Sequence, residues 1–525
     1  MNTKRPLRFF NTTGPCNPDD HYMLPPANRL VGAQLNRYIS DKLYWVLHAP
    51  RQTGKTTFLQ SWMKEINAGD EAISCYVSVE RCQGVEEAER AMPALCSSIQ
   101  ESAIKYGLPI PELSNGIDPY SMLSHILLNW SILVAPKPLV ILFDEVDVLV
   151  GETMVSFLRQ LRGGFATRGI GLFPVSIVLV GMRDLKDYIT ASKDGIAPNP
   201  GSPFNIKADS AVLANFQKED IVQLFAQRTT ENGQLITQEA LDYVYDRTKG
   251  QPWIVNNLFM RATMRILDKD STETVTLAHV EEACQQMILA RETHLDALAY
   301  RLKEPGVRDV IQTIITGDSD PNLTERDSFR LCLDLGLVAF ERGTPVIANP
   351  IYREVIVRQL TFGQQSAISE PEWVWELPDG SLDMNRIMAE FQSFWRQHAD
   401  LWEGKSELGY TEAFPHLLLM AFLQRVLNGG GKVDREYAAG RGRMDLHIEY
   451  NSFHYLIEIK LIHWYQTPVL VRKNGLEQIR RYREKFPPST PCWLVIFDRR
   501  NKEDKTPWDE RITWEVDGDI NVLGC

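Results

Sequence analysis

The stretch that most constrains the fold runs from residue 43 to residue 59, where three segments of different character follow one another. LYWVLHA has the composition of a strand, PRQTGKT is a polar turn, and the next residues repeat apolar side chains at helical spacing. Strand, turn, Gly-Lys-Thr and helix is the context of a phosphate-binding loop. The sequence therefore predicts a nucleoside triphosphate site, lined by Pro50, Arg51, Gln52, Thr53, Gly54, Lys55, Thr56 and Thr57.

The chemistry of such a loop assigns a role to each polar group. Backbone N–H groups of the turn and of the helix N-terminus would surround the phosphates. Lys55 would reach the β and γ oxygens of ATP, and Thr56 would ligate Mg²⁺. Ala49 stands where the motif usually has its first glycine. Alanine is strained there if the position needs a positive φ, and costs little if it ends the strand.

A second strand, LVILFDE at residues 139–145, ends in two acids. A continuous apolar run predicts a strand that is buried on both faces of a parallel sheet. Ligands bind at the carboxyl ends of such strands. We therefore expect Asp144 to hold Mg²⁺, and Glu145 to orient and deprotonate the attacking water. The alternative interpretation is a helix cap that follows a strand.

Arginines near two predicted strand ends are further candidates. The strand at 175–181 ends in Met-Arg-Asp, and Arg183 is the expected sensor of the γ-phosphate. Arg159, Arg162 and Arg168 follow the acidic pair, and one of them is a candidate to act across a subunit interface. The alternative for each is an ordinary solvated arginine. In the N-terminal arm, Tyr22 and Pro25 would either flank an adenine ring or pack the arm.

Residues 212–268 have helical patterns at 212–216, 219–230, 238–248 and 253–267, with Gly-Gln-Pro-Trp before the last. With A-x4-G-K-T, LVILFDE and VGMRD, this turn makes residues 20–290 resemble STAND-type and origin-recognition-type P-loop ATPases of the AAA+ kind. The resemblance implies that Pro252 contacts the base or ribose of the nucleotide. The alternative is a proline that simply begins a helix.

Residues 290–362 combine two helical segments, 307–315 and 328–335, with a hairpin at 337–348. This order is typical of a winged helix. Its second helix is mostly apolar, whereas a DNA-reading helix exposes several polar or basic side chains. We therefore favour a structural or regulatory winged helix that packs on the ATPase. Residues 363–384 are polar and contain Pro and Gly, which predicts a linker.

The C-terminal part contains Asp445 and, thirteen residues later, Glu458 and Lys460 on an apolar strand. Glu458 and Lys460 are two residues apart and so share one face of the strand. A hairpin that places Asp445 against Glu458 would make a two-carboxylate pocket for Mg²⁺ or Mn²⁺, with the carbonyl of Ile459 as a further ligand. Lys460 would position or deprotonate the attacking water while the metal polarises a phosphodiester.

The pattern D…E-x-K resembles the PD-(D/E)xK nuclease superfamily over residues 385–525. The resemblance implies an acid on a preceding helix, for which Glu412 is the candidate. Gln478 and Tyr482 lie four apart on a helical segment and match the Q-x-x-x-Y element of the RecB-like and phage-exonuclease branch. Met444 departs from the family, which usually has Pro before the Asp.

The net charge of −12 argues against a protein that coats nucleic acid along its whole surface. Residues 471–485 are the exception, with six Lys or Arg against two Glu, and are the best candidate for DNA-backbone contacts. The alternative is a solvated helix face. Eight scattered cysteines without a C-x-x-C pair, no signal-peptide core and no apolar run of about 20 residues predict a cytoplasmic protein without a membrane span.

The sequence thus predicts an α/β multidomain chain. We expect a parallel-sheet P-loop ATPase core at 1–210, a helical lid at 211–289, a winged helix at 290–362, a linker at 363–384, and a restriction-endonuclease-like domain at 385–525. The expected function is an ATP-regulated, Mg²⁺-dependent DNA nuclease of bacterial defence or mobile elements. The expected partners are a homo-oligomer and a protein or phage-derived trigger. The alternatives are a DNA-stimulated ATPase motor and a sensor whose C-terminal domain mainly grips DNA.

Overall fold

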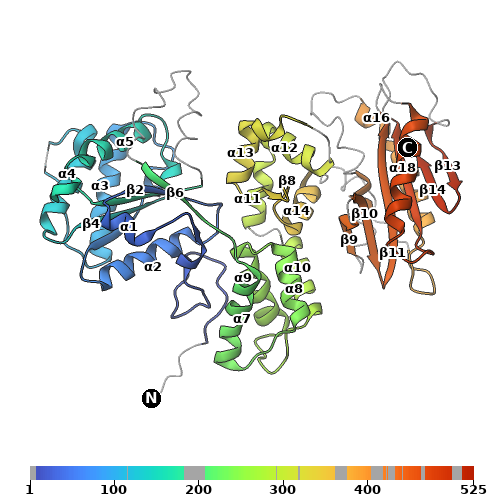
Figure 1. The fold of residues 1–525 in the computed structure, drawn as a ribbon, viewed down its shortest axis with the longest axis horizontal. Helices are drawn as coiled ribbons and strands as arrows, with labels where there is room; N and C mark the ends of the chain where they lie inside the picture. The colour runs from blue at the N-terminus through green and yellow to red at the C-terminus, as the bar shows by residue number, and fades with distance from the viewer. Residues whose placement is uncertain are drawn as a thin grey trace. The chain divides into compact units, whose positions relative to one another are not determined.

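The computed structural model describes residues 7–114, 116–182, 207–290, 293–316, 320–360, 375–403, 418–420, 422–423, 432–439, 442–462, 467–498 and 511–525. The chain divides into two compact units, Met1–Ala297 with Asn322–Tyr352, and Leu298–Pro321 with Arg353–Cys525. Figure 1 follows the chain from its blue N-terminus to its red C-terminus. None of the described helices combines the length and apolarity that a membrane crossing needs.

The first unit is built on a six-stranded sheet with the order β1-β6-β2-β5-β4-β3. Only β1 runs antiparallel to its neighbour β6, and the other neighbours are parallel. Because β2 lies between β5 and β6, the chain leaves β2 at a point where the strand order reverses, which is where open α/β sheets bind ligands. The strands are β1 Leu30–Val31, β2 Tyr44–His48, β3 Ile73–Ser78, β4 Leu139–Asp144, β5 Ser176–Gly181 and β6 Lys207–Leu213.

Helices cover both faces of this sheet (Figure 1). Val46, Ile141 and Leu179 pack in a core on the side of α3, α4 and α5. Their strand neighbours Trp45 and Leu142 pack in a second core on the side of α1 and α2. Burial on both faces explains why these strands read as continuous apolar runs. The helices are α1 Leu35–Ser40, α2 Lys55–Ala68, α3 Ala88–Lys105, α4 Pro119–Leu133 and α5 Gly151–Phe165, with short 3₁₀ turns at Pro26–Arg29, Glu80–Cys82, Val146–Val148 and Arg168–Ile170.

A helical segment follows the sheet: α7 Lys218–Asn232, α8 Gln238–Thr248, α9 Pro252–Met260 with a π-helical turn Arg261–Ile266, and α10 Leu277–Leu289. One predicted helix, residues 212–216, is wrong. Val212 pairs with Val31 at the end of β6, and the chain then turns into α7. The short apolar run that suggested helix belongs to a strand whose partner lies far away in sequence, and such runs are ambiguous without that partner.

The segment predicted as a winged helix contains the expected helices and hairpin. They are α11 Thr293–Arg301, α12 Pro305–Thr316, a 3₁₀ turn Leu323–Glu325, α13 Asp327–Asp334, β7 Val338–Glu341, β8 Thr344–Ile347 and α14 Pro350–Leu360. Phe329 of α13 packs edge-on against Phe340 of the hairpin, with ring centroids 5.8 Å apart. The division between the two compact units falls within this segment, so a winged helix at 290–362 stays a prediction.

The second unit contains a six-stranded sheet with the order β13-β14-β12-β11-β10-β9. β9, β10 and β11 form an antiparallel meander, and β12 is parallel to both β11 and β14. Helix α18 connects β11 to β12 and packs on the sheet through Leu476 and Ile479. The predicted α/β class, with a parallel-sheet ATPase-like unit and a C-terminal α/β sheet domain, is confirmed. The elements are α16 Met384–Glu403, β9 Lys432–Ala439, β10 Gly442–Tyr450, β11 Phe453–Ile462, α18 Pro468–Arg483, β12 Cys492–Asp498, β13 Trp514–Asp517 and β14 Ile520–Gly524.

Candidate functional sites

The phosphate loop joins the end of β2 to the start of α2. Ala49 is buried and donates its backbone N–H to the carbonyl of Gly181 at 3.4 Å, which extends the pairing of β2 with β5. Its φ is not positive, whereas Gln52 and Gly54 have φ of 58° and 93°. Ala49 therefore ends the strand, where alanine costs little, and the left-handed positions fall later in the loop.

Lys55 is half-buried at the first position of α2. Its Nζ donates hydrogen bonds to the carbonyl oxygens of Ala49, at 2.7 Å, and Pro50, at 2.8 Å. Burial lowers the pKa of Lys55 to about 8, because desolvation disfavours the ammonium form. The side chain thus lies folded over the loop, with its charge available to phosphate oxygens near neutral pH.

Two acids lie where β4 ends, beside the start of α2. The Thr56 hydroxyl donates to Asp144 Oδ2 at 2.7 Å, and Tyr76 donates to the same oxygen at 3.1 Å. Glu145 has a φ of 64°, and its carboxylate accepts a hydrogen bond from Ser78 at 2.8 Å. Burial raises the pKa of Glu145, which makes it a better proton acceptor. A hydroxyl and a carboxylate at this spacing fit Mg²⁺, which prefers oxygen ligands.

The Gly-Gln-Pro turn lies between α8 and α9, with Pro252 at the first turn of α9 and Gln251 as its N-cap. Gln251 accepts from the N–H of Ile254 and donates to the carbonyl of Gln52 in the phosphate loop at 3.5 Å. The helix-starting role of Pro252 is therefore present, and the turn also touches the loop. A contact of Pro252 with a nucleotide stays a prediction.

Arg29 was not predicted, yet it ties the loop to the start of the helical segment. Its two terminal nitrogens donate to the carbonyls of Thr53, at 2.9 Å, and Ala214, at 2.8 Å, and its guanidinium lies over the ring of Phe216. Arg29 is 8% exposed, and burial lowers its pKa to about 10, so it stays charged at neutral pH. No local motif announces it, because Ala214 is 185 residues away.

The N-terminal arm packs against the same region. Thr57 accepts a hydrogen bond from the backbone N–H of Cys16 at 3.0 Å, so its hydroxyl faces the arm. Tyr22 is fully buried against Phe10, which favours packing over the adenine-flanking alternative. In the turn after α13, a Cβ added to Gly336 would lie 2.7 Å from Pro50 Cγ, so this turn also contacts the phosphate loop.

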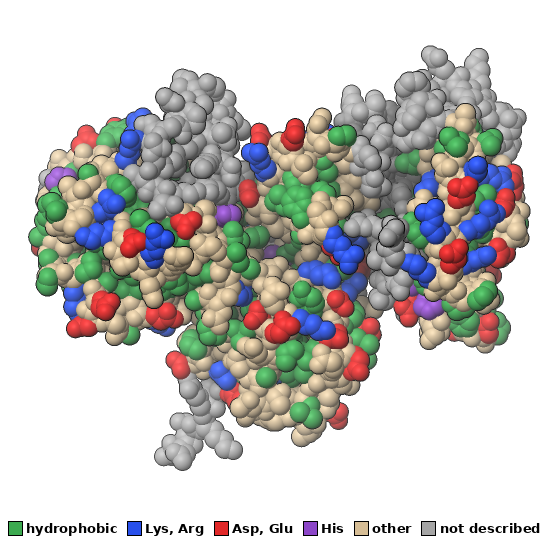
Figure 2. All heavy atoms as spheres, viewed as in Figure 1, with side chains coloured by type: hydrophobic (Ala, Val, Ile, Leu, Met, Phe, Trp, Pro, Cys, Tyr) green, Lys and Arg blue, Asp and Glu red, His purple; other side chains and the backbone are tan. Residues whose placement is uncertain are grey.

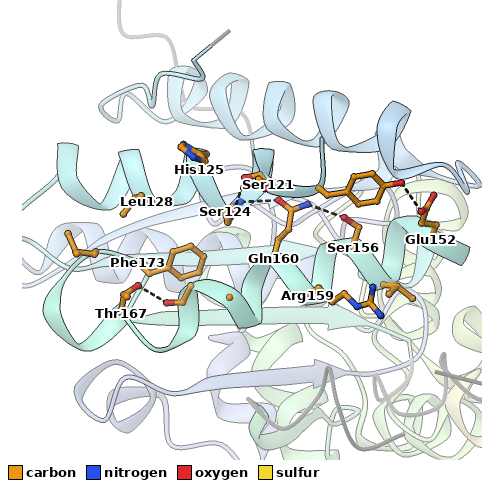
Figure 3. A pocket seen from close by; sticks show the side chains of 15 residues that line it. Ser121, Ser124, His125, Leu128, Glu152, Ser156, Arg159, Gln160, Thr167 and Phe173 are labelled. Atoms are coloured by element: carbon orange, nitrogen blue, oxygen red, sulfur yellow. Dashed lines mark hydrogen bonds between the residues drawn. The ribbon is translucent and has the colours of Figure 1, made fainter. Parts of the chain in front are cut away.

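Arg159 lines a groove of about 650 Å³ between α4 and α5, shown in Figure 3. Gln160 spans the groove floor: it accepts from the N–H of Ser124 at 3.1 Å and donates to Ser156 at 3.1 Å. Arg168 is engaged elsewhere, because it donates to the carbonyls of Lys42 and Phe165. Arg159 is therefore better placed than Arg168 to contact another molecule.

The second site lies on the β10–β11 hairpin. Leu446 of β10 faces Ile457 of β11, and continuing this antiparallel register by one residue puts the Asp445 backbone opposite Glu458. Glu458 has a fully buried side chain, and Lys460 donates to its Oε1 at 2.6 Å. A buried carboxylate beside an ammonium and across from a second acid position is an oxygen-rich set of the kind that divalent cations take.

Helix α18 brings Gln478 and Tyr482 to the same sheet, and Gln478 donates to the Tyr482 hydroxyl at 2.9 Å. Gly475 allows the close approach: a Cβ there would lie 2.6 Å from Leu494 Cδ1 and 3.2 Å from Lys460 Cγ. The structure thus places the Q-x-x-x-Y pair on the helix that packs directly over Lys460.

The basic stretch 471–485 is only partly open. Three of its six cationic side chains, Arg472, Arg480 and Arg483, form ion pairs with Glu515, Asp517 and Asp519 respectively. Exposed pairs of this kind contribute roughly 0–1 kcal/mol each to stability. Acids that follow in sequence therefore pair with this flank of α18, and the predicted role of the stretch in DNA-backbone contacts stays a prediction.

Two predicted site residues, Glu412 and Arg183, lie outside the described residues, and of Asp445 only the backbone is described. Within the described ranges no group of three or more His, Cys, Asp or Glu is arranged to hold a metal ion. All eight cysteines are free thiols. The predicted roles of the site residues stay predictions.

Comparison with known proteins gives one family match, to the PD-(D/E)XK nuclease superfamily at residues 410–497. No curated protein matches the chain. Solved structures with a similar arrangement include a Walker-type ATPase of Pyrococcus abyssi, with 15% identity, 66% of this chain and 99% of that chain covered, and a TM-score of 0.47. Another is Cdc6p from Pyrobaculum aerophilum, with 12% identity, coverages of 63% and 91%, and a TM-score of 0.34.

The family match covers Asp445, Glu458, Lys460, Gln478 and Tyr482, the residues on which the nuclease resemblance was predicted. The phosphate loop, with Lys55 behind it and Thr56 bonded to Asp144, supplies the ATPase part. The chain therefore combines a parallel-sheet fold with a phosphate loop and, at residues 410–497, a C-terminal region that matches the PD-(D/E)XK nuclease superfamily.

Proposed function

We propose that the chain is an ATP-regulated, metal-dependent nuclease that cuts DNA in the cytoplasm, with the nucleotide state controlling its C-terminal phosphodiesterase. The observation that carries the proposal is the buried Glu458 carboxylate, bonded to Lys460. The register of β10 with β11, continued by one residue, would bring the Asp445 backbone opposite it. Burying a charged carboxylate costs free energy of folding unless a cation or a hydrogen-bond donor pairs with it.

At the nuclease site, Glu458, Asp445 and the carbonyl of Ile459 would hold Mg²⁺ or Mn²⁺. Such an ion supplies Lewis acidity toward a phosphodiester oxygen. Lys460, held by its bond to Glu458, orients the attacking water, and it would accept a proton from that water only in its neutral amine form. Gln478 and Tyr482 position the scissile strand from α18.

At the ATPase site, the loop amides and Lys55 bind the phosphates, and Thr56 and Asp144 hold Mg²⁺. Glu145 orients and deprotonates water, with a pKa raised by burial. Ser78 fixes the Glu145 carboxylate in the free protein. Hydrolysis would therefore require the carboxylate to turn from Ser78 toward the water.

Regulation would begin at the contacts of the phosphate loop. Gln251 and Arg29 bond to loop carbonyls from the helical segment and from the arm, so phosphate release at the loop would alter both contacts. Homo-oligomers with Arg159 at the subunit contact would transmit this change. By analogy with sensor-plus-effector ATPases, we place the protein in bacterial defence or in a mobile element, with a protein or phage-derived trigger.

The test is cleavage of linear, circular and single-stranded DNA with Mg²⁺ or Mn²⁺, with and without ATP. Asp445→Ala and Lys55→Ala should both lose the cleavage that depends on ATP, and Glu449→Ala, another acid on β10, should leave cleavage intact. Loss in Asp445→Ala alone would assign the ATPase to a different step. Wild-type protein that never cuts but hydrolyses ATP faster with DNA would support the motor alternative instead.

A further inference from the structure

A short acidic hairpin lies against the helix that carries the Q-x-x-x-Y pair. Arg472 pairs with Glu515, Arg480 with Asp517 and Arg483 with Asp519, and Asp517 also lies 4.0 Å from Arg472. We call the three arginines the arginine row, and residues 514–524 with their three acids the acidic hairpin. In Figure 2, blue and red side chains interleave over the surface where α18 and β13 lie in Figure 1.

The arginine row occupies one flank of α18. At 100° per residue, positions 472, 480 and 483 fall within about a quarter of a turn of one another. Gln478 lies on the opposite flank, and Gly475 between them faces Lys460. One helix thus presents its polar pair on one side and its cations on the other, with the predicted nuclease residue Lys460 beneath it.

The acidic hairpin is built so that its charges reach this flank. Glu515 and Asp517 alternate along β13 and so share one side of the strand, and Asp519 follows in the turn to β14. β13 stands at the end of the described strand order and pairs only with β14 in it. Moving β13 would therefore disturb its pairing with β14 at one edge of the sheet, while β14 stays paired with β12 and the β10–β11–β12 centre stays in place.

The ion pairs between the arginine row and the acidic hairpin are exposed, so other anions can replace the acids. The three arginines keep 23–50% of their side-chain surface exposed, and the three acids 35–61%. Ion pairs this exposed add little to stability and weaken with salt. A phosphodiester backbone also offers anionic oxygen acceptors to guanidinium groups, and its binding is further favoured by release of condensed counterions.

We propose that the acidic hairpin is an internal competitor of nucleic acid: it occupies the arginine row in the free protein and gives way to a phosphodiester backbone when nucleic acid binds. This inference rests on the proposed nuclease function. It adds to the predicted DNA-backbone surface on α18 a competitor from the same domain, which limits binding to that surface.

The experiment measures binding of labelled single- and double-stranded DNA in Ca²⁺, in an Asp445→Asn background that prevents cleavage. Combining Glu515→Gln, Asp517→Asn and Asp519→Asn should tighten binding at least about tenfold at low salt. Adding Arg472→Gln, Arg480→Gln and Arg483→Gln should remove this gain, because the gain acts through the arginine row.

The control makes the same charge change elsewhere. Asp41→Asn, Asp70→Asn and Glu101→Gln also neutralise three exposed acids, each paired with a surface cation of the first unit. This triple variant should change the dissociation constant less than about twofold, since those sites lie outside the arginine row. Equal tightening by both triple variants would reduce the effect to net charge and overturn the proposal.

Other outcomes are equally decisive. Unchanged or weaker binding by a folded hairpin variant would show that the acids only brace the edge of the sheet. If the triple hairpin variant fails to fold, Asp519→Asn alone, in the turn, should still tighten binding about twofold, and no change there overturns the proposal. Cleavage by the Asp445-intact protein in Mg²⁺ is scored separately, so failure of the nuclease function is distinguishable from failure of the hairpin.

Discussion

The Lys55 ammonium in the phosphate loop loses its proton at mildly alkaline pH. Burial lowers its pKa to about 8, and only the protonated form attracts phosphate. Bound phosphate raises this pKa again, so ATP binding above pH 8 must take up a proton. We expect full affinity below about pH 8 and a loss of up to about tenfold per pH unit above it, measured as the dissociation constant of a fluorescent ATP analogue up to about pH 9.5.

Lys55→Arg is the matched control, because arginine stays charged throughout this range. Whatever its absolute affinity, its profile should be flat between about pH 7.5 and pH 9.5. A flat profile for the wild type would mean that Lys55 is protonated in the free protein up to higher pH than its burial implies.

Arg29 connects the phosphate loop to the segment after β6 by donating to the backbone carbonyls of Thr53 and Ala214. Among the described side chains, no other donates to these two oxygens. Arg29→Met removes the bonds to Thr53 and Ala214 and leaves both acceptors with lost partners. Hydrogen bonds with a charged donor contribute about 1.5–3 kcal/mol each, so the free energy of unfolding of the first unit should fall by about 3 kcal/mol. Denaturant titration measures this, and Arg37→Met, an exposed partner of Asp41, should leave the midpoint unchanged.

At the scale of elements, Gly475 sets how closely α18 approaches β11 and β12. Gly475→Ala would push a methyl group to 2.6 Å from Leu494 and 3.2 Å from Lys460. Overpacking costs about 1–3 kcal/mol, which exceeds the gain of about 1 kcal/mol from alanine in a helix. We expect lower stability and a larger loss of DNA cleavage, because the shift displaces Lys460.

Gly163 of α5 supplies the control for this substitution, since a Cβ there meets nothing within 4 Å. Gly163→Ala should raise the free energy of unfolding by up to about 1 kcal/mol through helix propensity alone. Thermal unfolding of the two variants side by side separates propensity from packing. Stabilisation by Gly475→Ala as well would show that α18 has room to move.

The elements that could be predicted from the sequence are those whose burial produces a local pattern of apolar residues. β2, β4 and β5 are covered on both faces and read as apolar runs, and α8 was predicted at its observed bounds. β6 was missed because KADSAVL is half polar and depends on distant partners. β13 and β14 were also missed, although Gly518-Asp519, the two residues between Asp517 and Ile520, is a typical hairpin turn.

The same difference applies to the sites. Lys55, Asp144, Glu458 and Lys460 stand in short motifs whose spacing reports their chemistry, so they could be named in advance. Arg29, Ser78 and the acids of the hairpin act through partners that only folding brings together. The charge count along residues 471–485 did not include the acids that pair with its arginines, because those acids lie more than thirty residues further along the chain.

For the whole molecule, regulation by ATP requires that ATP binding in the phosphate-loop unit changes the affinity of the nuclease unit for nucleic acid. If ATP changes the affinity for nucleic acid by some factor, nucleic acid must change the affinity for ATP by the same factor. With Asp445→Asn protein in Ca²⁺, we expect a non-hydrolysable ATP analogue to shift the dissociation constant of DNA about 5- to 150-fold, and saturating DNA to shift that of the analogue equally. The Lys55→Ala variant should lose the first shift. If both factors equal one, nucleotide binding does not regulate the nuclease, and the two activities only share a chain.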